Sequence, residues 1–130
     1  MKILRATSLL VVGAIEPELP LWRDRLGYSV VVEVPHGDRL GFALLARDGQ
    51  QLMLQTSQSL AEDVPAVAAL GVTHLLYNDV DSLDEVLRAM EGIEILVAPR
   101  TTFYGAREVF YRAAAGHVVA FAEHAAASVS

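Results

Sequence analysis

The chain contains an internal duplication, and this feature constrains its fold more than any other. Two halves repeat the order strand, helix, strand, strand, strand, with helix-ending glycines at Gly27 and Gly92 and turn glycines at Gly49 and Gly116. The offset of about 65 residues is long for a solenoid repeat and suits a duplicated supersecondary unit. The pattern predicts one α+β domain over residues 1–130, built from two βαβββ modules at about residues 3–57 and 72–124.

The expected elements are separated by turn and helix-end signals. Glu16-Pro17-Glu18 predicts a helix start, because proline fits the first turn and acidic side chains stabilise the positive end of the helix dipole. Trp22 follows at helical spacing, so we expect it in the core. The predicted helices are residues 16–26 and 82–90, with a short helix or irregular stretch at 60–70. The predicted strands are residues 3–12, 28–34, 40–47, 50–56, 72–78, 93–98, 107–112 and 117–123, and residues 99–105 are expected to form a loop.

Composition excludes several classes of site and partner. The chain has no cysteine, which rules out disulfides, thiolate metal sites and a cysteine nucleophile. Its 16 Asp and Glu outnumber its 10 Lys and Arg, and no basic stretch is present, so we expect no nucleic-acid partner. The apolar runs are far shorter than the roughly 20 residues that span a bilayer, so we expect no membrane partner and a cytoplasmic location.

Three segments resemble the sequence pattern of one known superfamily. Residues 15–28 combine an acidic opening, an aromatic residue and then Leu-Gly-aromatic, while residues 41–55 and 103–123 look like the hairpins that follow. In this order the segments resemble the glyoxalase/bleomycin-resistance/dioxygenase (vicinal oxygen chelate) superfamily over nearly the whole chain. The resemblance implies two βαβββ modules whose mixed sheets curl around a cavity, commonly completed in a dimer.

The resemblance also implies four metal-ligand positions, which relatives fill with His, Glu or Gln. Carried over to this chain, they fall at Thr7, at Gln51 or Met53, at His74 and at Ala120. Only His74 is a good ligand and Gln51 a marginal one, whereas a catalytic metal generally needs about three protein ligands. We therefore expect no cofactor, and a chain that has lost the metal site of the superfamily.

The favoured hypothesis is a metal-free protein that binds a small organic molecule, as bleomycin-type resistance proteins sequester a drug without changing it. Glu108 shares the strand parity of Phe110, and Tyr104 lies in a loop at the expected mouth of the cavity. No catalytic residue is assigned. The predicted ligand-binding residues, polar contacts and cavity wall together, are Thr7, Gln51, Met53, Gln55, His74, Tyr104, Glu108, Phe110 and Ala120.

Two alternatives stay open. A divalent-metal-dependent lyase, isomerase or dioxygenase would use His74, Gln51 and a displaced carboxylate, Glu108 or Glu123. A dimeric ferredoxin-like sensor module would also alternate helices with strands. The few lysines and high apolar fraction favour a homodimer in each case.

Overall fold

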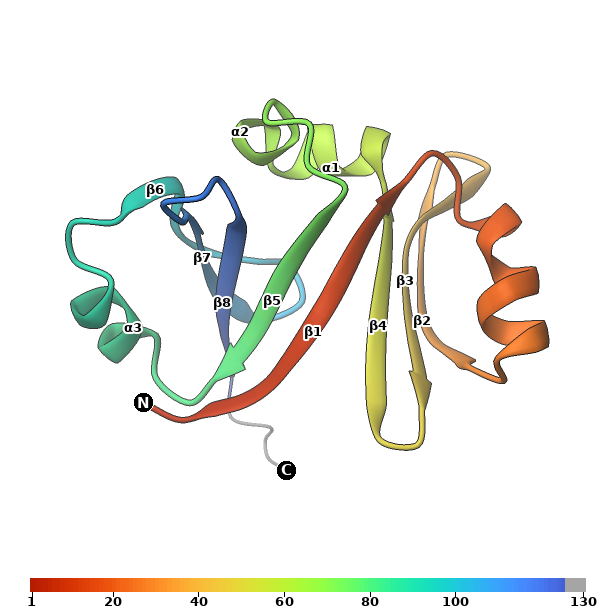
Figure 1. Ribbon diagram of the computed structural model, residues 1–130, viewed down its shortest axis with the longest axis horizontal. Helices are drawn as coiled ribbons and strands as arrows, with labels where there is room; N and C mark the ends of the chain where they lie inside the picture. The colour runs from red at the N-terminus through yellow and green to blue at the C-terminus, as the bar shows by residue number, and fades with distance from the viewer. Residues whose placement is uncertain (126–130) are drawn as a thin grey trace. The chain divides into compact units, whose positions relative to one another are not determined.

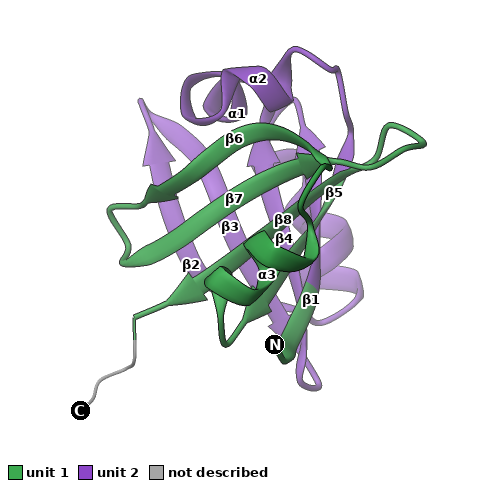
Figure 2. Cartoon of the chain, turned by 90° about the vertical axis from the view of Figure 1, so that its left-hand side faces the viewer, with its two compact units in different colours: residues 1–6, 75–130 green, residues 7–74 purple. Residues whose placement is uncertain are grey.

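The computed structural model describes residues 1–125 and divides the chain into two compact units, shown in Figure 2. Unit 2 comprises residues 7–74, and the described part of unit 1 comprises residues 1–6 and 75–125. Each unit contains four strands in mixed pairing. Within residues 1–125 no helix is both long and apolar enough to cross a membrane.

Unit 2 contains β1 (Ile3–Val12, continuing from unit 1), β2 (Ser29–His36), β3 (Arg39–Arg47) and β4 (Gln50–Thr56), drawn in red to yellow in Figure 1. Their order is β2-β3-β4-β1, in which only the β4-β1 pair is parallel. The β3–β4 turn is tight because Asp48 and Gly49 both adopt positive φ, at 52° and 78°. This conformation suits the right-handed twist of the hairpin, and it fixes the register of β4.

The predicted helix at residues 16–26 is replaced by a 3₁₀ turn (η1, Glu16–Glu18) and a π-helix (η2, Pro20–Arg25). Pro20 has no N–H, so an α-helical hydrogen-bond ladder cannot pass through it. The chain compensates with a wider turn, in which the amide of Leu26 donates to the carbonyl of Leu21 at 3.0 Å. The prediction of a helical segment here was correct, but its type was wrong.

The core of unit 2 lies between η1–η2 and one face of its sheet. Alternate residues of β3 and β4 supply it, and Trp22 packs against its edge as expected. Its buried members are Ile15, Leu19, Ala43, Leu45, Leu52 and Leu54. Two short helices, α1 (Ser57–Asp63) and α2 (Pro65–Ala68), follow β4, and the hydroxyl of Thr56 caps α1 by accepting from the amide of Ser59 at 3.1 Å.

Unit 1 contains β5 (His74–Val80, of which His74 is assigned to unit 2), α3 (Leu83–Ala89), β6 (Glu94–Thr101), β7 (Ala106–Arg112) and β8 (Val118–His124). Their order is β5-β8-β7-β6, with only β5-β8 parallel. The predicted loop at residues 99–105 is shorter than expected because β6 continues through Pro99. The other side of β6 has no strand partner in this order, so proline is tolerated there.

Helix α3 covers one face of the unit 1 sheet. Val86 of the helix packs with Val109, Tyr111 and Phe121 of the sheet in a second buried cluster. The hydroxyl of Ser82 caps the helix. Alternation of side chains along the strands therefore leaves Glu108, Phe110 and their neighbours on the opposite face, which we call the far face of unit 1.

The acidic start of α3 holds the N-terminus of the chain, also within unit 1. The amide of Lys2 donates to the carboxylate of Asp81 at 2.7 Å, and the amide of Asp81 donates back to the carbonyl of Lys2 at 3.1 Å. The terminal ammonium lies 2.8 Å from the carboxylate of Glu85, and this hydrogen bond lowers the pKa of Glu85. The pair is exposed, so its contribution to stability is small.

Candidate functional site

A buried carboxylate lies on the far face of unit 1. Glu108 of β7 is only 1% exposed, which is uncommon for a side chain that carries charge near neutral pH. The hydroxyls of Tyr77 and Tyr104 both donate to its Oε2, and Arg100 donates to its Oε1 at 3.1 Å. Three donors from β5, β6 and the β6–β7 turn thus converge on one carboxylate, and these hydrogen bonds offset the cost of its burial.

Strand register explains why these groups meet. Arg100 lies directly opposite Glu108 across the β6–β7 pair. Phe110 lies opposite Ala120, which in turn lies beside Tyr77. Paired residues point to the same face of a sheet, so the far face combines this polar cluster with the apolar side chains of Phe110 and Ala120. The expectation that Glu108 and Phe110 share a face with Ala120 is confirmed.

The surroundings of Tyr77 in this cluster keep its phenol in the neutral form. Burial disfavours the phenolate of Tyr77, and the negative charge of Glu108 disfavours it further, so the pKa of Tyr77 is raised far above its usual value. Arg100 supplies the compensating positive charge and lies 5.9 Å from the centre of the Phe110 ring. With its pKa raised, Tyr77 stays neutral at neutral pH and acts as a hydrogen-bond donor to Glu108.

This raised pKa predicts a delayed ionisation of tyrosine at alkaline pH. Tyr77 in the unfolded chain ionises near pH 10, so its neutral form stabilises the fold fully below that pH, and the stabilisation is lost as the pH rises above it. Burial raises the pKa of Tyr111 as well. In an absorbance titration at 295 nm, part of the signal of the four tyrosines should change only when the circular dichroism of the fold is lost.

The matched variant is Tyr77→Phe, which should remove part of that delayed signal. A titration in which all tyrosines ionise in one step near pH 10, with the fold intact, would contradict the raised pKa.

The predicted residues of unit 2 share a face of their own sheet. Thr7, Met53 and Gln55 lie opposite the helix-covered core, since Leu9 pairs with Met53 and Val11 pairs with Gln55 in the parallel β1–β4 register. Gln51 has the same parity. The amide nitrogen of Gln55 donates to the hydroxyl of Ser59 at 3.1 Å. The hydroxyl of Thr7, which is 1% exposed, has no hydrogen-bond partner among the described residues.

The expected place of His74 requires a correction. His74 is exposed, and its Nε2 lies 3.1 Å from the hydroxyl of Ser8. Alternation along β5 puts Leu75 and Tyr77 on one face and His74 on the other. The strand begins two residues later than predicted, so His74 is its first residue rather than a central one. The buried residue at this point is Leu75, whereas His74 is exposed.

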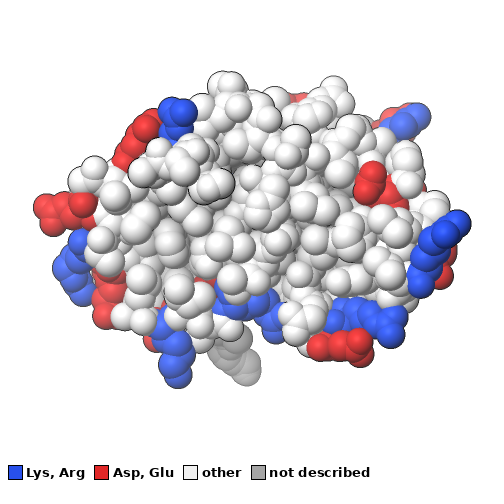
Figure 3. Space-filling model, viewed as in Figure 1, with Lys and Arg blue, Asp and Glu red and all other residues white. Residues whose placement is uncertain are grey.

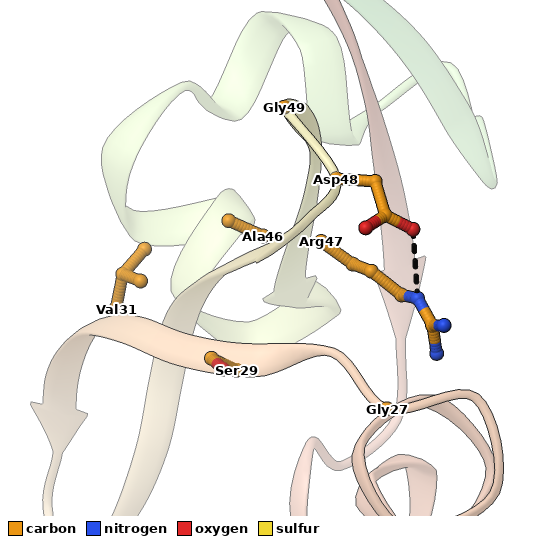
Figure 4. Close-up of a pocket in the computed structure, with 7 residues that line it drawn as sticks. All are labelled: Gly27, Ser29, Val31, Ala46, Arg47, Asp48 and Gly49. Carbon is orange, nitrogen blue, oxygen red and sulfur yellow. Dashed lines mark hydrogen bonds and ion pairs between the residues drawn. The ribbon is translucent and has the colours of Figure 1, made fainter.

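A shallow open depression lies elsewhere on unit 2, between β2 and the β3–β4 hairpin (Figure 4). Its volume is about 600 Å³, and it is lined by Gly27, Ser29, Val31, Ala46, Arg47, Asp48 and Gly49. Arg47 is paired with Asp48 at 3.0 Å and donates to the carbonyl of Leu26. The cationic side chain is thus already engaged, and the depression has neither the enclosure nor the buried polar groups of a ligand site.

Comparison with known protein families shows to which family the chain is related. The model of the Glyoxalase/Bleomycin resistance protein/Dioxygenase superfamily matches residues 3–121. The chain belongs to this superfamily. The resemblance inferred from the three sequence segments is confirmed, and the match selects the glyoxalase-type fold over the ferredoxin-like alternative.

Solved structures agree with the family at the level of the fold. A superfamily member from Vibrio splendidus 12B01 has a TM-score of 0.70 at 22% identity, covering 92% of this chain and 97% of that one. Methylmalonyl-CoA epimerase from Mycobacterium tuberculosis has a TM-score of 0.67 at 22% identity, covering 92% and 86%. An uncharacterised protein from Methanosarcina mazei has a TM-score of 0.64 at 25% identity, covering 99% and 98%. No protein with a curated description matches the chain significantly.

The metal that the superfamily implies does not fit the side chains at the corresponding positions. Thr7 offers a neutral hydroxyl and Ala120 no donor at all, while the second position offers either the thioether of Met53 or the neutral amide of Gln51, a marginal ligand. His74 is exposed and contacts Ser8 instead. Among residues 1–125, no three His, Cys, Asp or Glu side chains lie close enough together to hold a metal ion. The carboxylate of Glu108 is engaged by three donors already.

Two members of the Glu108 cluster were missed by sequence reasoning. Arg100 was assigned to a loop, because Pro99 suggested that the strand had ended before it. Tyr77 was not selected, because the family resemblance directed attention to His74 on the same strand. The signal that would have found both is parity: an acidic residue at an inward strand position requires donors on neighbouring strands.

Proposed function

We propose that this chain binds a small organic molecule on the far face of unit 1, without a bound metal ion, and that Glu108 anchors the ligand. The observation that carries the proposal is the 1% exposure of Glu108 together with its three converging donors. A few precisely placed polar groups on an otherwise apolar surface are typical of small-molecule sites.

A contribution to folding stability alone does not explain why this cluster is polar. Replacing a buried charged pair by apolar residues of similar volume is often neutral or stabilising. The other face of the same sheet shows that this chain can build a purely apolar contact, since α3 packs there on Val109 and Phe121. The polar groups of the far face are therefore better explained by recognition than by folding, as perturbed ionisable groups often mark functional sites.

The superfamily relationship supports the same class of function. Bleomycin resistance proteins belong to this superfamily, and its fold is shared with methylmalonyl-CoA epimerases. A metal-dependent lyase, isomerase or dioxygenase is the second candidate function, although residues 1–125 contain no group of three His, Cys, Asp or Glu side chains that could hold a metal ion. A cytoplasmic location and a homodimer belong to the proposal as well. Light scattering on the purified protein tests the second of these.

The test of the proposed function is a ligand screen by thermal shift. Wild-type protein and Glu108→Gln are screened in parallel against amines, carboxylates, phosphates and neutral aromatic compounds. A ligand at 100 times its dissociation constant adds about 2.7 kcal/mol of stability. We expect compounds that raise the melting temperature of wild type and not of Glu108→Gln. A complete screen in which no compound separates the two proteins would contradict the proposal.

A further inference from the structure

The two tyrosine hydroxyls that donate to Glu108 are held in place in different ways. Tyr77 projects from β5 and is 7% exposed, so it is fixed by a strand and its packing. Tyr104 projects from the turn between β6 and β7 and is 49% exposed, beside Phe103 at 89%. The backbone of that turn uses a positive φ of 84° at Gly105. Of the two tyrosines, Tyr104 is therefore the donor with less packing to hold it.

The turn lies beside the end of β8, as Figure 2 shows for these two segments of unit 1. The amide of Ala125 donates to the carbonyl of Gly105 at 3.0 Å. The ring of Tyr104 lies 6.5 Å from the ring of His124, measured between centroids. The side chain of Tyr104 thus extends from His124 at the end of β8 to the carboxylate of Glu108 on β7.

A second carboxylate lies in the same row of the far face. Asp79 of β5 pairs with Ala122 of β8, and Ala122 pairs with Glu108 of β7. Two strand spacings separate the backbones of Asp79 and Glu108, which is about 10 Å. The residue between them is Ala122, so β8 places only a methyl group between the two carboxylates. The side-chain partners in this row are Arg100 on Glu108 and the imidazole of His124 on Asp79, at 3.1 and 3.0 Å.

We propose that Tyr104 occupies the ligand position on Glu108, and that the ligand which displaces it is an organic cation with an N–H donor, such as an ammonium or amidinium attached to an aromatic or apolar body. This inference rests on the proposed function and names its ligand class. The ammonium takes over the hydrogen bond of the Tyr104 hydroxyl to Oε2 of Glu108, while Tyr77 and Arg100 keep theirs.

The row of Asp79, Ala122 and Glu108 on the far face favours a cationic ligand over an anionic one. A carboxylate that loses a donor must receive another one, because a buried acceptor without a partner is costly. An anionic ligand offers only acceptors and would face Glu108 and Asp79 together. A neutral hydroxyl offers the donor without the charge, so it gains less from two carboxylates. The net charge of −6 favours approach of a cation as well.

The probe for the test is benzylammonium, with benzyl alcohol and benzoate as neutral and anionic analogues of the same shape. Binding is followed by NMR titration of the backbone amides of Gly105 and Glu108. We expect benzylammonium to bind Tyr104→Phe about tenfold more tightly than wild type, since no hydroxyl has to be displaced from the carboxylate. Benzyl alcohol should bind more weakly than benzylammonium, and benzoate should not bind.

The control variant is Tyr111→Phe, which changes the same residue type on the other face of β7 and should leave the affinity unchanged. Glu108→Gln should abolish binding of benzylammonium. Tyr104→Ala removes the ring as well as the hydroxyl. It therefore provides a second variant in case the ring of Tyr104→Phe stays beside Glu108. Equal affinity of benzylammonium for wild type and both Tyr104 variants would overturn the inference, and so would preferential binding of benzoate.

Failure of this inference and failure of the proposed function give different results. The thermal screen could yield a compound that requires Glu108 but binds wild type and Tyr104→Phe equally. This result would overturn the proposal that the ligand displaces Tyr104, and it would still support small-molecule binding at Glu108. A screen in which no compound depends on Glu108 would contradict both the displacement of Tyr104 and the proposed function.

Discussion

Replacing Glu108 with alanine is expected to lower the free energy of unfolding by about 3 kcal/mol. The substitution leaves Arg100 without its carboxylate and Tyr77 without an acceptor, both on the far face of unit 1. Arg100 is partly exposed, so water recovers some of the loss, and the effect lies at the lower end of the range for broken buried ion pairs. Urea denaturation followed by circular dichroism measures the change.

Glu108→Gln is the matched variant. It keeps the shape and one carbonyl acceptor but turns the other oxygen into an amide group that donates, so we expect a smaller loss of about 1 to 2 kcal/mol. An alanine variant as stable as wild type would show that the cluster is not formed as described.

Leu54→Ala is expected to lower the free energy of unfolding by about 3 kcal/mol, because it opens a cavity in the core of unit 2. Leu54 is fully buried among residues of β3, β4 and the segment before η1. The neighbouring residue Met53 is half-buried on the opposite face of the same strand. Met53→Ala should therefore lower the free energy of unfolding by a much smaller amount, about 1 kcal/mol.

The comparison of these two variants tests the register of β4, since a slip of one residue exchanges the two faces. The prediction would be wrong if Met53→Ala were the more damaging of the two substitutions in the same urea titration.

The sequence predicted elements well where turns determine the register. Strand β4 was predicted at its observed bounds, because Asp48 and Gly49 at positive φ fix the hairpin that starts it. The faces of Gln51, Met53 and Gln55 followed directly from that register. The duplication also predicted the element order of both halves, apart from the helices α1 and α2 between them.

Prediction was weakest where tertiary pairing decided the bounds. Val72 and Thr73 have high β propensity, but β5 begins only at His74. Pro99 would end a central strand, but it lies within β6 because one side of that strand is unpaired. The second error fell on the site, since it placed Arg100, a partner of Glu108, in a loop. The predicted ligand-binding role of the site residues stays a prediction.

Basic and acidic side chains are interspersed on the surface that Figure 3 draws. On the face drawn in Figure 3, uncharged side chains fill the centre, and basic and acidic groups lie close together along the margins. Within unit 1 the pairs Arg107–Asp84 and Arg112–Glu94, at 3.5 and 4.0 Å, follow this pattern. Screened surface pairs of this kind contribute little to stability or to long-range attraction of anions.

The central claim is that this member of the superfamily binds a small molecule without a metal ion. Elemental analysis of untagged protein, purified without chelator and then incubated with Mn²⁺, Ni²⁺ and Zn²⁺, tests it most directly. We expect far less than one ion per chain after removal of free metal, because Thr7, Met53 and Ala120 supply no ligand set. Close to one tightly held ion per chain, lost in Glu108→Gln, would contradict the claim and make Glu108 a metal ligand.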